Sequence, residues 1–141
     1  MLAGKAEIEA LIPHAGAMCL LDELLEWDAE RIRCLARSHR DAANPMRAGG
    51  ELPALCGIEY AAQAMALHGR LTEQAVTSSA GYLASVREVV CRVARLDDLE
   101  GDLVIDAQRL MGDEAHVVYG FSLSAGGTTV LEGRAAVVLQ A

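Results

Sequence analysis

The residues from Leu52 to Ala66 combine an apolar, alanine-rich composition with one carboxylate and one carboxamide. Glu59 and Gln63 are four residues apart, so they share one face of a helix. A helix that is apolar nearly all round is normally buried, and a carboxylate in a dry site must be paired, neutral or functional. Burial can keep such a group protonated, which suits a general acid. A glutamate at the helix edge would instead reach water and have no chemical role.

His14 is the candidate for a matching general base, because an unshifted histidine titrates near neutrality. It follows Pro13 in a loop that contains Gly16, where a side chain can approach a pocket. The alternative is a histidine that caps the first helix or donates to a backbone carbonyl. No two of the four histidines show the short spacing of a zinc motif, so we expect no metal site. The three weaker candidates are His39, His68 and His116, of which His68 lies near a helix end that favours a cation.

The composition indicates one domain, residues 1–141, with a core of small aliphatic side chains, since only one Phe and one Trp are present. The net charge of −8 and the absence of a Lys/Arg cluster argue against nucleic-acid binding. We expect no signal peptide and no membrane span. The widely spaced cysteines indicate reduced core residues in a cytoplasmic protein, although adjacent strands could still pair two of them: Cys19, Cys34, Cys56 and Cys91.

The hydrophobic pattern predicts two helices and up to six strands. The helices are 5–11 and 53–72; residues 18–27 fit a strand or a helix; the strands are 31–38, 82–91, 103–110, 116–124 and 128–139. The last four are joined by links containing Gly101-Asp102, Gly112-Asp113 and Gly126-Gly127, which predicts antiparallel neighbours. The fold class is therefore α+β, with an antiparallel sheet wrapped around a long central helix. Unpaired sheet edges predict a dimer.

Four segments in this order resemble one known family. They are Leu11-Ile12-Pro13-His14 with Met18 to Glu23, Gly57 to Ala64, Gly81 to Ala84, and Gly101-Asp102-Leu103. Together they resemble the small 3-hydroxyacyl-[acyl-carrier-protein] dehydratases of the hotdog fold. The resemblance covers nearly the whole chain and implies that fold.

The chain departs from that family at one position. Family members carry a Gly-His-Phe-Pro-Gly loop with the catalytic histidine fourteen residues before the glutamate, and Pro45 stands at that position here. The usual pair of His and Glu therefore cannot form. The chain looks closer to a divergent branch, the dehydratase-like proteins of aryl polyene biosynthesis clusters, whose members resemble partner subunits as well as enzymes.

The resemblance implies a substrate and a set of roles. A 3-hydroxyacyl chain on the phosphopantetheine arm of an acyl carrier protein would lose a C2 proton and its C3 hydroxyl, with no other cofactor. Glu59 would protonate the hydroxyl and His14 would take the proton. The amides of Ala54 and Leu55, at the helix start, would hold the thioester carbonyl, and Gln63 would hold Glu59 or a water.

Two other functions fit the same residues. An acyl thioesterase of the same fold would use Glu59 to activate water and would need no 3-hydroxyl. An inactive subunit would complete the dimer of an active dehydratase, and the missing loop histidine favours this reading. The dimer could be a homodimer or a heterodimer with another hotdog subunit.

Overall fold

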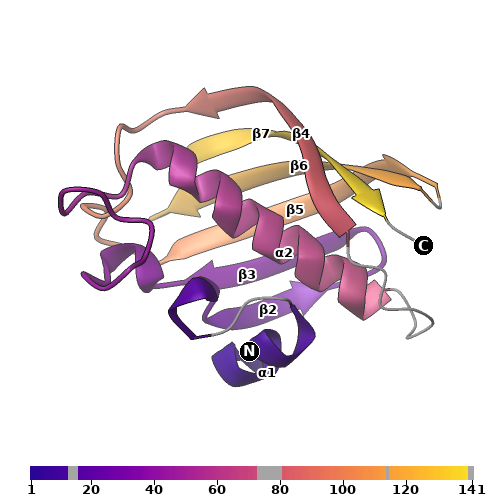
Figure 1. Cartoon of the computed structure of the whole chain (residues 1–141), viewed down its shortest axis with the longest axis horizontal. Coiled ribbons are helices and arrows are strands. Elements are labelled where there is room, and N and C mark those ends of the chain that lie inside the picture. The colour runs from indigo at the N-terminus through magenta and orange to yellow at the C-terminus, as the bar shows by residue number, and fades with distance from the viewer. Residues whose placement is uncertain (13–15, 73–80, 114, 140–141) are drawn as a thin grey trace.

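A curved antiparallel sheet of seven strands surrounds one long helix in the computed structural model, which describes residues 1–12, 16–72, 81–113 and 115–139 (Figure 1). The sheet order is β1-β2-β3-β5-β6-β7-β4. The helices are α1 (Lys5–Leu11) and α2 (Gly57–Thr72). The strands are β1 (Ala3–Gly4), β2 (Glu23–Trp27), β3 (Arg31–Ala36), β4 (Gly81–Cys91), β5 (Leu103–Gly112), β6 (His116–Ala125) and β7 (Thr128–Leu139). This arrangement confirms the predicted α+β hotdog fold.

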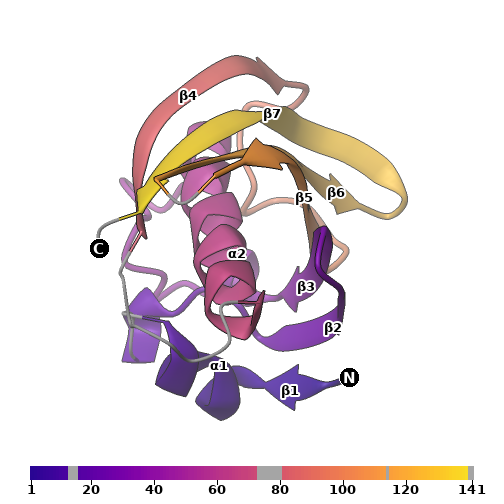
Figure 2. The same ribbon diagram turned by 90° about the vertical axis from the view of Figure 1, so that its right-hand side faces the viewer.

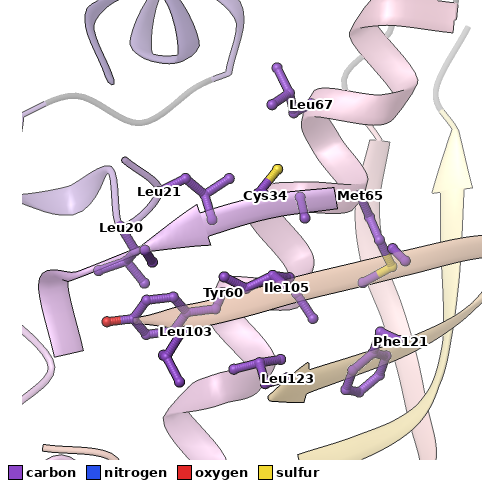
Figure 3. Packing of buried hydrophobic residues seen from close by; sticks show 14 of the residues in the cluster. Leu20, Leu21, Cys34, Tyr60, Met65, Leu67, Leu103, Ile105, Phe121 and Leu123 are labelled. Carbon is purple, nitrogen blue, oxygen red and sulfur yellow. The ribbon is translucent and has the colours of Figure 1, made fainter. Parts of the chain in front are cut away.

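The sheet curves around α2, as the end-on view shows (Figure 2). Alternation along each strand directs every second side chain at the helix, so the core is built from these inward positions. The largest contributors from α2 are Tyr60, Met65 and Leu67, and they pack with strand residues that include Leu103, Ile105, Phe121 and Leu123 (Figure 3). Small residues on α2 bring helix and sheet close together: Gly57, Ala61 and Ala64 are buried.

Two local differences from the expected elements concern the segments before β2 and before α2. Residues 18–27 do not form one element, because a 3-10 turn at Gly16–Met18 is followed by residues 19–22 without regular secondary structure, and β2 begins only at Glu23. A second 3-10 turn, Ala54–Cys56, precedes α2, so the regular helix begins at Gly57 rather than at Pro53.

The predicted pairing of β4 with β5 is wrong. β4 pairs with β7 at the edge of the sheet, whereas β5 pairs with β3. The link between them does not turn back at Gly101-Asp102; it crosses the start of α2 and bonds to the segment before that helix. Ala54 N donates to Ala94 O over 3.0 Å, and Leu96 N donates to Leu52 O over 2.8 Å. These bonds require the link to leave the β4 edge.

The cysteines are all free, and two of them lie in the core as predicted. Cys19 and Cys34 are buried, and burial raises the pKa of the Cys34 thiol to about 12. Cys56 is half-buried, and Cys91 is exposed at the end of β4, so its predicted core position is wrong. Among the described helices, none has the length and apolar character that crossing a membrane requires.

His68 is fully buried near the end of α2, which contradicts its expected role as a cation there. Its Nε2 lies 2.8 Å from the Asp28 carbonyl, and because a carbonyl only accepts, Nε2 carries the hydrogen. Nδ1 then accepts from the Tyr119 hydroxyl over 2.8 Å. Burial lowers the pKa of His68, so the ring is neutral. His39 is also fully buried, and burial lowers its pKa as well.

These two neutral histidines predict a loss of stability in mild acid. The unfolded chain binds protons with an ordinary histidine pKa near 6.5, while the folded chain resists them, so stability is full above that pH and falls as pH drops through it. Urea unfolding at pH 7.5 and 5.5 should show this fall in the wild type. The fall should be smaller in His68→Gln and unchanged in His116→Gln, where the histidine is exposed. An equal fall in wild type and His68→Gln would contradict the prediction.

Candidate active site

Glu59 lies in the first turn of α2 and is half-buried. A carboxylate at this position is stabilised by the positive end of the helix dipole, which is a structural reason for its presence. Its Oε1 is 3.5 Å from Gln63 Nε2, so the two side chains share one helix face as their spacing predicts. The glutamate therefore lies at the start of the helix, next to the turn that holds the two backbone amides predicted to bind a carbonyl.

Gln63 is almost completely buried, with 1% of its surface exposed, and its amide orientation is fixed by its partners. Its Oε1 accepts from Leu20 N over 2.8 Å, and its Nε2 donates to Met18 O over 2.8 Å. The second hydrogen on Nε2 is directed to Glu59. Gln63 thus connects the helix that carries Glu59 to the segment that leads away from the predicted base.

His14 lies outside the described residues, so its pairing with Glu59 stays a prediction. The description resumes at Gly16, and Met18, four residues beyond His14, is held by Gln63. The chain is therefore anchored close to α2 shortly after the predicted base.

The two backbone amides predicted to hold a carbonyl differ in their surroundings. A 3-10 turn has no internal acceptor for its first N–H groups, here those of Ala54 and Leu55. The Ala54 N–H donates to Ala94 O, so this group is already used within the fold. Leu55 is 59% exposed. Of the two predicted carbonyl-binding amides, that of Leu55 is therefore the remaining candidate.

The loop that replaces the family's histidine loop packs against the helix through its buried asparagine. Pro45 is exposed, whereas Asn44 is 6% exposed. The Nδ2 group of Asn44 donates to Ser38 O over 2.9 Å and to the Tyr60 hydroxyl over 3.1 Å. Its Oδ1 accepts from Met46 N over 2.8 Å. The asparagine holds the loop in the absence of the histidine.

Three polar residues beside the site, Ser38, Asn44 and Tyr60, were not predicted from the sequence. Asn44 lies between the predicted strand 31–38 and the predicted helix 53–72, and Tyr60 lies within the apolar run of that helix. The available signal was the tyrosine hydroxyl, because a buried tyrosine usually finds a hydrogen-bond partner.

No cluster of three or more potential metal-ligating side chains occurs among residues 1–12, 16–72, 81–113 and 115–139. Thus the described arrangement is one of carboxylate, carboxamide and backbone N–H groups. This set can exchange protons and bind a developing negative charge.

A sheet wrapped around a helix with a glutamate in its first turn defines a hotdog-fold protein, and comparisons with solved structures agree. The dehydratase heterocomplex ApeI:P from Xenorhabdus doucetiae matches with a TM-score of 0.84 and 26% identity, over 95% of this chain and 91% of that chain. The family model of ApeP-like proteins, described as ApeP dehydratase, matches residues 6–141. The chain therefore belongs to the ApeP-like family, and its function is that of a dehydratase-like protein of polyene synthesis.

Thioesterases share the fold at lower identity. Zebra fish thioesterase superfamily member 2 matches with a TM-score of 0.69 and 15% identity, over 96% of this chain and 95% of that chain. A thioesterase mutant from Pseudomonas aeruginosa gives 0.65 and 15%, over 99% and 95%. The comparison with curated proteins finds no match. At this identity the thioesterases support the fold and give little support to thioesterase activity.

Proposed function

We propose that this protein removes water from a 3-hydroxyacyl thioester carried on the phosphopantetheine arm of an acyl carrier protein. The observation that carries the proposal is the position of the half-buried Glu59 at the start of α2. Gln63 donates both to Glu59 and to Met18 O, in the segment that follows His14. This arrangement connects a proton donor to the chain that bears the proposed base, within a family of dehydratases.

The proposed reaction has two proton transfers, one from C2 and one to the C3 oxygen. His14 takes the proton from C2, and the C2–H electrons move toward the thioester carbonyl, whose oxygen accepts from the Leu55 N–H group. The electrons then form the C2–C3 double bond as the C3–O bond breaks, and Glu59 donates a proton to the departing hydroxyl. The products are an enoyl thioester and water. The cycle closes when the proton on His14 returns to Glu59 through solvent.

We propose a second hotdog subunit as partner, paired along β4. β4 bonds to β7 on one side only and forms one edge of the sheet, with Leu83 and Val90 partly exposed along it. Near Glu59, Met18 and Leu55 are 53% and 59% exposed, which is apolar surface that a partner or an acyl chain could cover. The matched dehydratase is itself a heterocomplex.

The free cysteines support a location in the cytoplasm.

The test is to incubate the purified protein with a 3-hydroxyacyl carrier protein and to measure the mass of the acyl arm by mass spectrometry. Loss of water from the arm by the protein alone supports the proposal. A free acid instead would identify a thioesterase. If the arm is unchanged, the assay is repeated with a co-expressed hotdog dehydratase, and loss of water only then shows that the active unit is the complex.

A second candidate function is that of a catalytically silent partner, which Pro45 at the usual histidine position favours. In this case the co-expressed subunit would supply all catalytic groups. The complex would then keep its full rate when Glu59 is replaced.

A further inference from the structure

A directional chain of hydrogen bonds leads from the loop at Asn44 into the core. The Ser38 hydroxyl donates to the Leu20 carbonyl over 2.7 Å, which uses its single hydrogen. The Tyr60 hydroxyl must therefore donate to Ser38 Oγ, 2.8 Å away. Asn44 Nδ2 in turn donates to the Tyr60 oxygen over 3.1 Å. Because the Leu20 carbonyl can only accept, it determines the direction of the Ser38 bond, which in turn determines the direction of the Tyr60 bond.

The backbone of Leu20 links these hydrogen bonds to Gln63. Its carbonyl accepts from Ser38, and its N–H donates to Gln63 Oε1 over 2.8 Å. Because Oε1 is held there, the Nε2 group of Gln63 is directed at Met18 O and Glu59. Leu20 and Tyr60 belong to the same buried cluster (Figure 3).

Ser38 is half-buried, and the other members of this hydrogen-bonded network are buried. Tyr60 is fully buried, Leu20 and Gln63 are each 1% exposed, and Asn44 is 6% exposed. Burial raises the pKa of Tyr60, so the hydroxyl keeps the hydrogen that it donates. A buried network with every member satisfied favours a single arrangement. A phenylalanine at this position would bury the same ring. The specific contribution of the tyrosine is therefore the hydrogen bond from its hydroxyl to Ser38.

We propose that Ser38, Asn44 and Tyr60 are positioning residues for the dehydration. They hold the backbone of Leu20, and Leu20 orients Gln63, which directs the Glu59 carboxylate at the substrate. The same hold fixes the segment that leads from His14. The inference rests on the proposed role of Glu59 and adds three residues that do not touch the substrate.

The activity test compares two buried tyrosines. In the complex that dehydrates, Tyr60→Phe should lower kcat by about ten- to a hundredfold with KM within about twofold, because small misplacement of a catalytic group is costly. Tyr119→Phe is the matched control, since it removes the hydroxyl of another buried tyrosine, one that is bonded to His68. It should leave kcat within about twofold. Ser38→Thr should keep the rate that Ser38→Ala loses, and this pair serves if Tyr60→Phe does not fold.

A second readout does not depend on activity. Amide hydrogen exchange at Leu20 and the side-chain amide signals of Gln63, followed by NMR, should change in Tyr60→Phe and not in Tyr119→Phe. Unchanged exchange at Leu20 in Tyr60→Phe, or an equal loss of kcat in both variants, would overturn the inference. If the wild-type complex dehydrates nothing, the proposed function fails, and hydrogen exchange alone decides whether the network holds Leu20 and Gln63.

Discussion

Glu59→Gln should lower the rate of dehydration by at least about a hundredfold, because general acid catalysis contributes about 10² to 10⁴. Glutamine has nearly the same shape as glutamate but cannot give a proton to the departing hydroxyl. The substitution should therefore change kcat strongly and the free energy of unfolding little. The measurement is the steady-state rate on a 3-hydroxyacyl carrier protein, with urea unfolding of the same sample.

The control for this change is Glu26→Gln. The Glu26 side chain lies on β2 and is 71% exposed, so its loss removes a negative charge without touching the helix start. It should retain the wild-type rate. A rate in Glu59→Gln within a fewfold of wild type would assign the proton donor to a partner subunit and would favour the silent-subunit alternative.

Gly57→Ala should destabilise the protein by about 1–3 kcal/mol, although alanine is the better helix former. A Cβ at this position would lie 2.5 Å from Leu131 Cδ2 and 3.0 Å from Leu123 Cδ2. Both leucines are fully buried, so neither has space to withdraw. Because Gly57 is two residues from Glu59, the displaced helix start should also lower the dehydration rate. Urea unfolding and the same rate assay measure both effects.

Gly69→Ala in the same helix should have the opposite sign. Among the residues that the structure describes, no atom of another element lies within 4 Å of a Cβ built there, so helix propensity decides the effect, and stability should rise by about 0.5–1 kcal/mol. If both glycine substitutions stabilise the protein, the close approach of α2 to β7 is not a constraint on the fold.

The sequence predicted the elements well where one physical signal dominated. Alternation identified β3, β5, β6 and β7, and the apolar run after Pro53 identified α2. The shared face of Glu59 and Gln63 followed from helix geometry alone. These predictions need only local periodicity, which the residues themselves contain.

The predictions that failed concern contacts between residues that are distant in sequence. The place of β4 beside β7 is set by bonds between residues 94–96 and 52–54, which no local pattern shows. The use of the Ala54 amide by Ala94 has the same origin. His68 was expected to be charged at a helix end, but Tyr119 on β6 and Asp28 in the loop after β2 bind its two ring nitrogens. The Tyr60 network likewise joins four separate segments.

The edge position of β4 has a consequence for folding during synthesis. β4 leaves the ribosome before β5, β6 and β7, yet its partner strand in the described sheet is β7, the last to emerge. Until then β4 and the growing sheet each present an unpaired edge, and pairing over such distances in sequence is slow. The nascent chain therefore completes the edge that we propose as the dimer interface only after β7 emerges, so premature association along the wrong strand is the folding hazard that this topology creates.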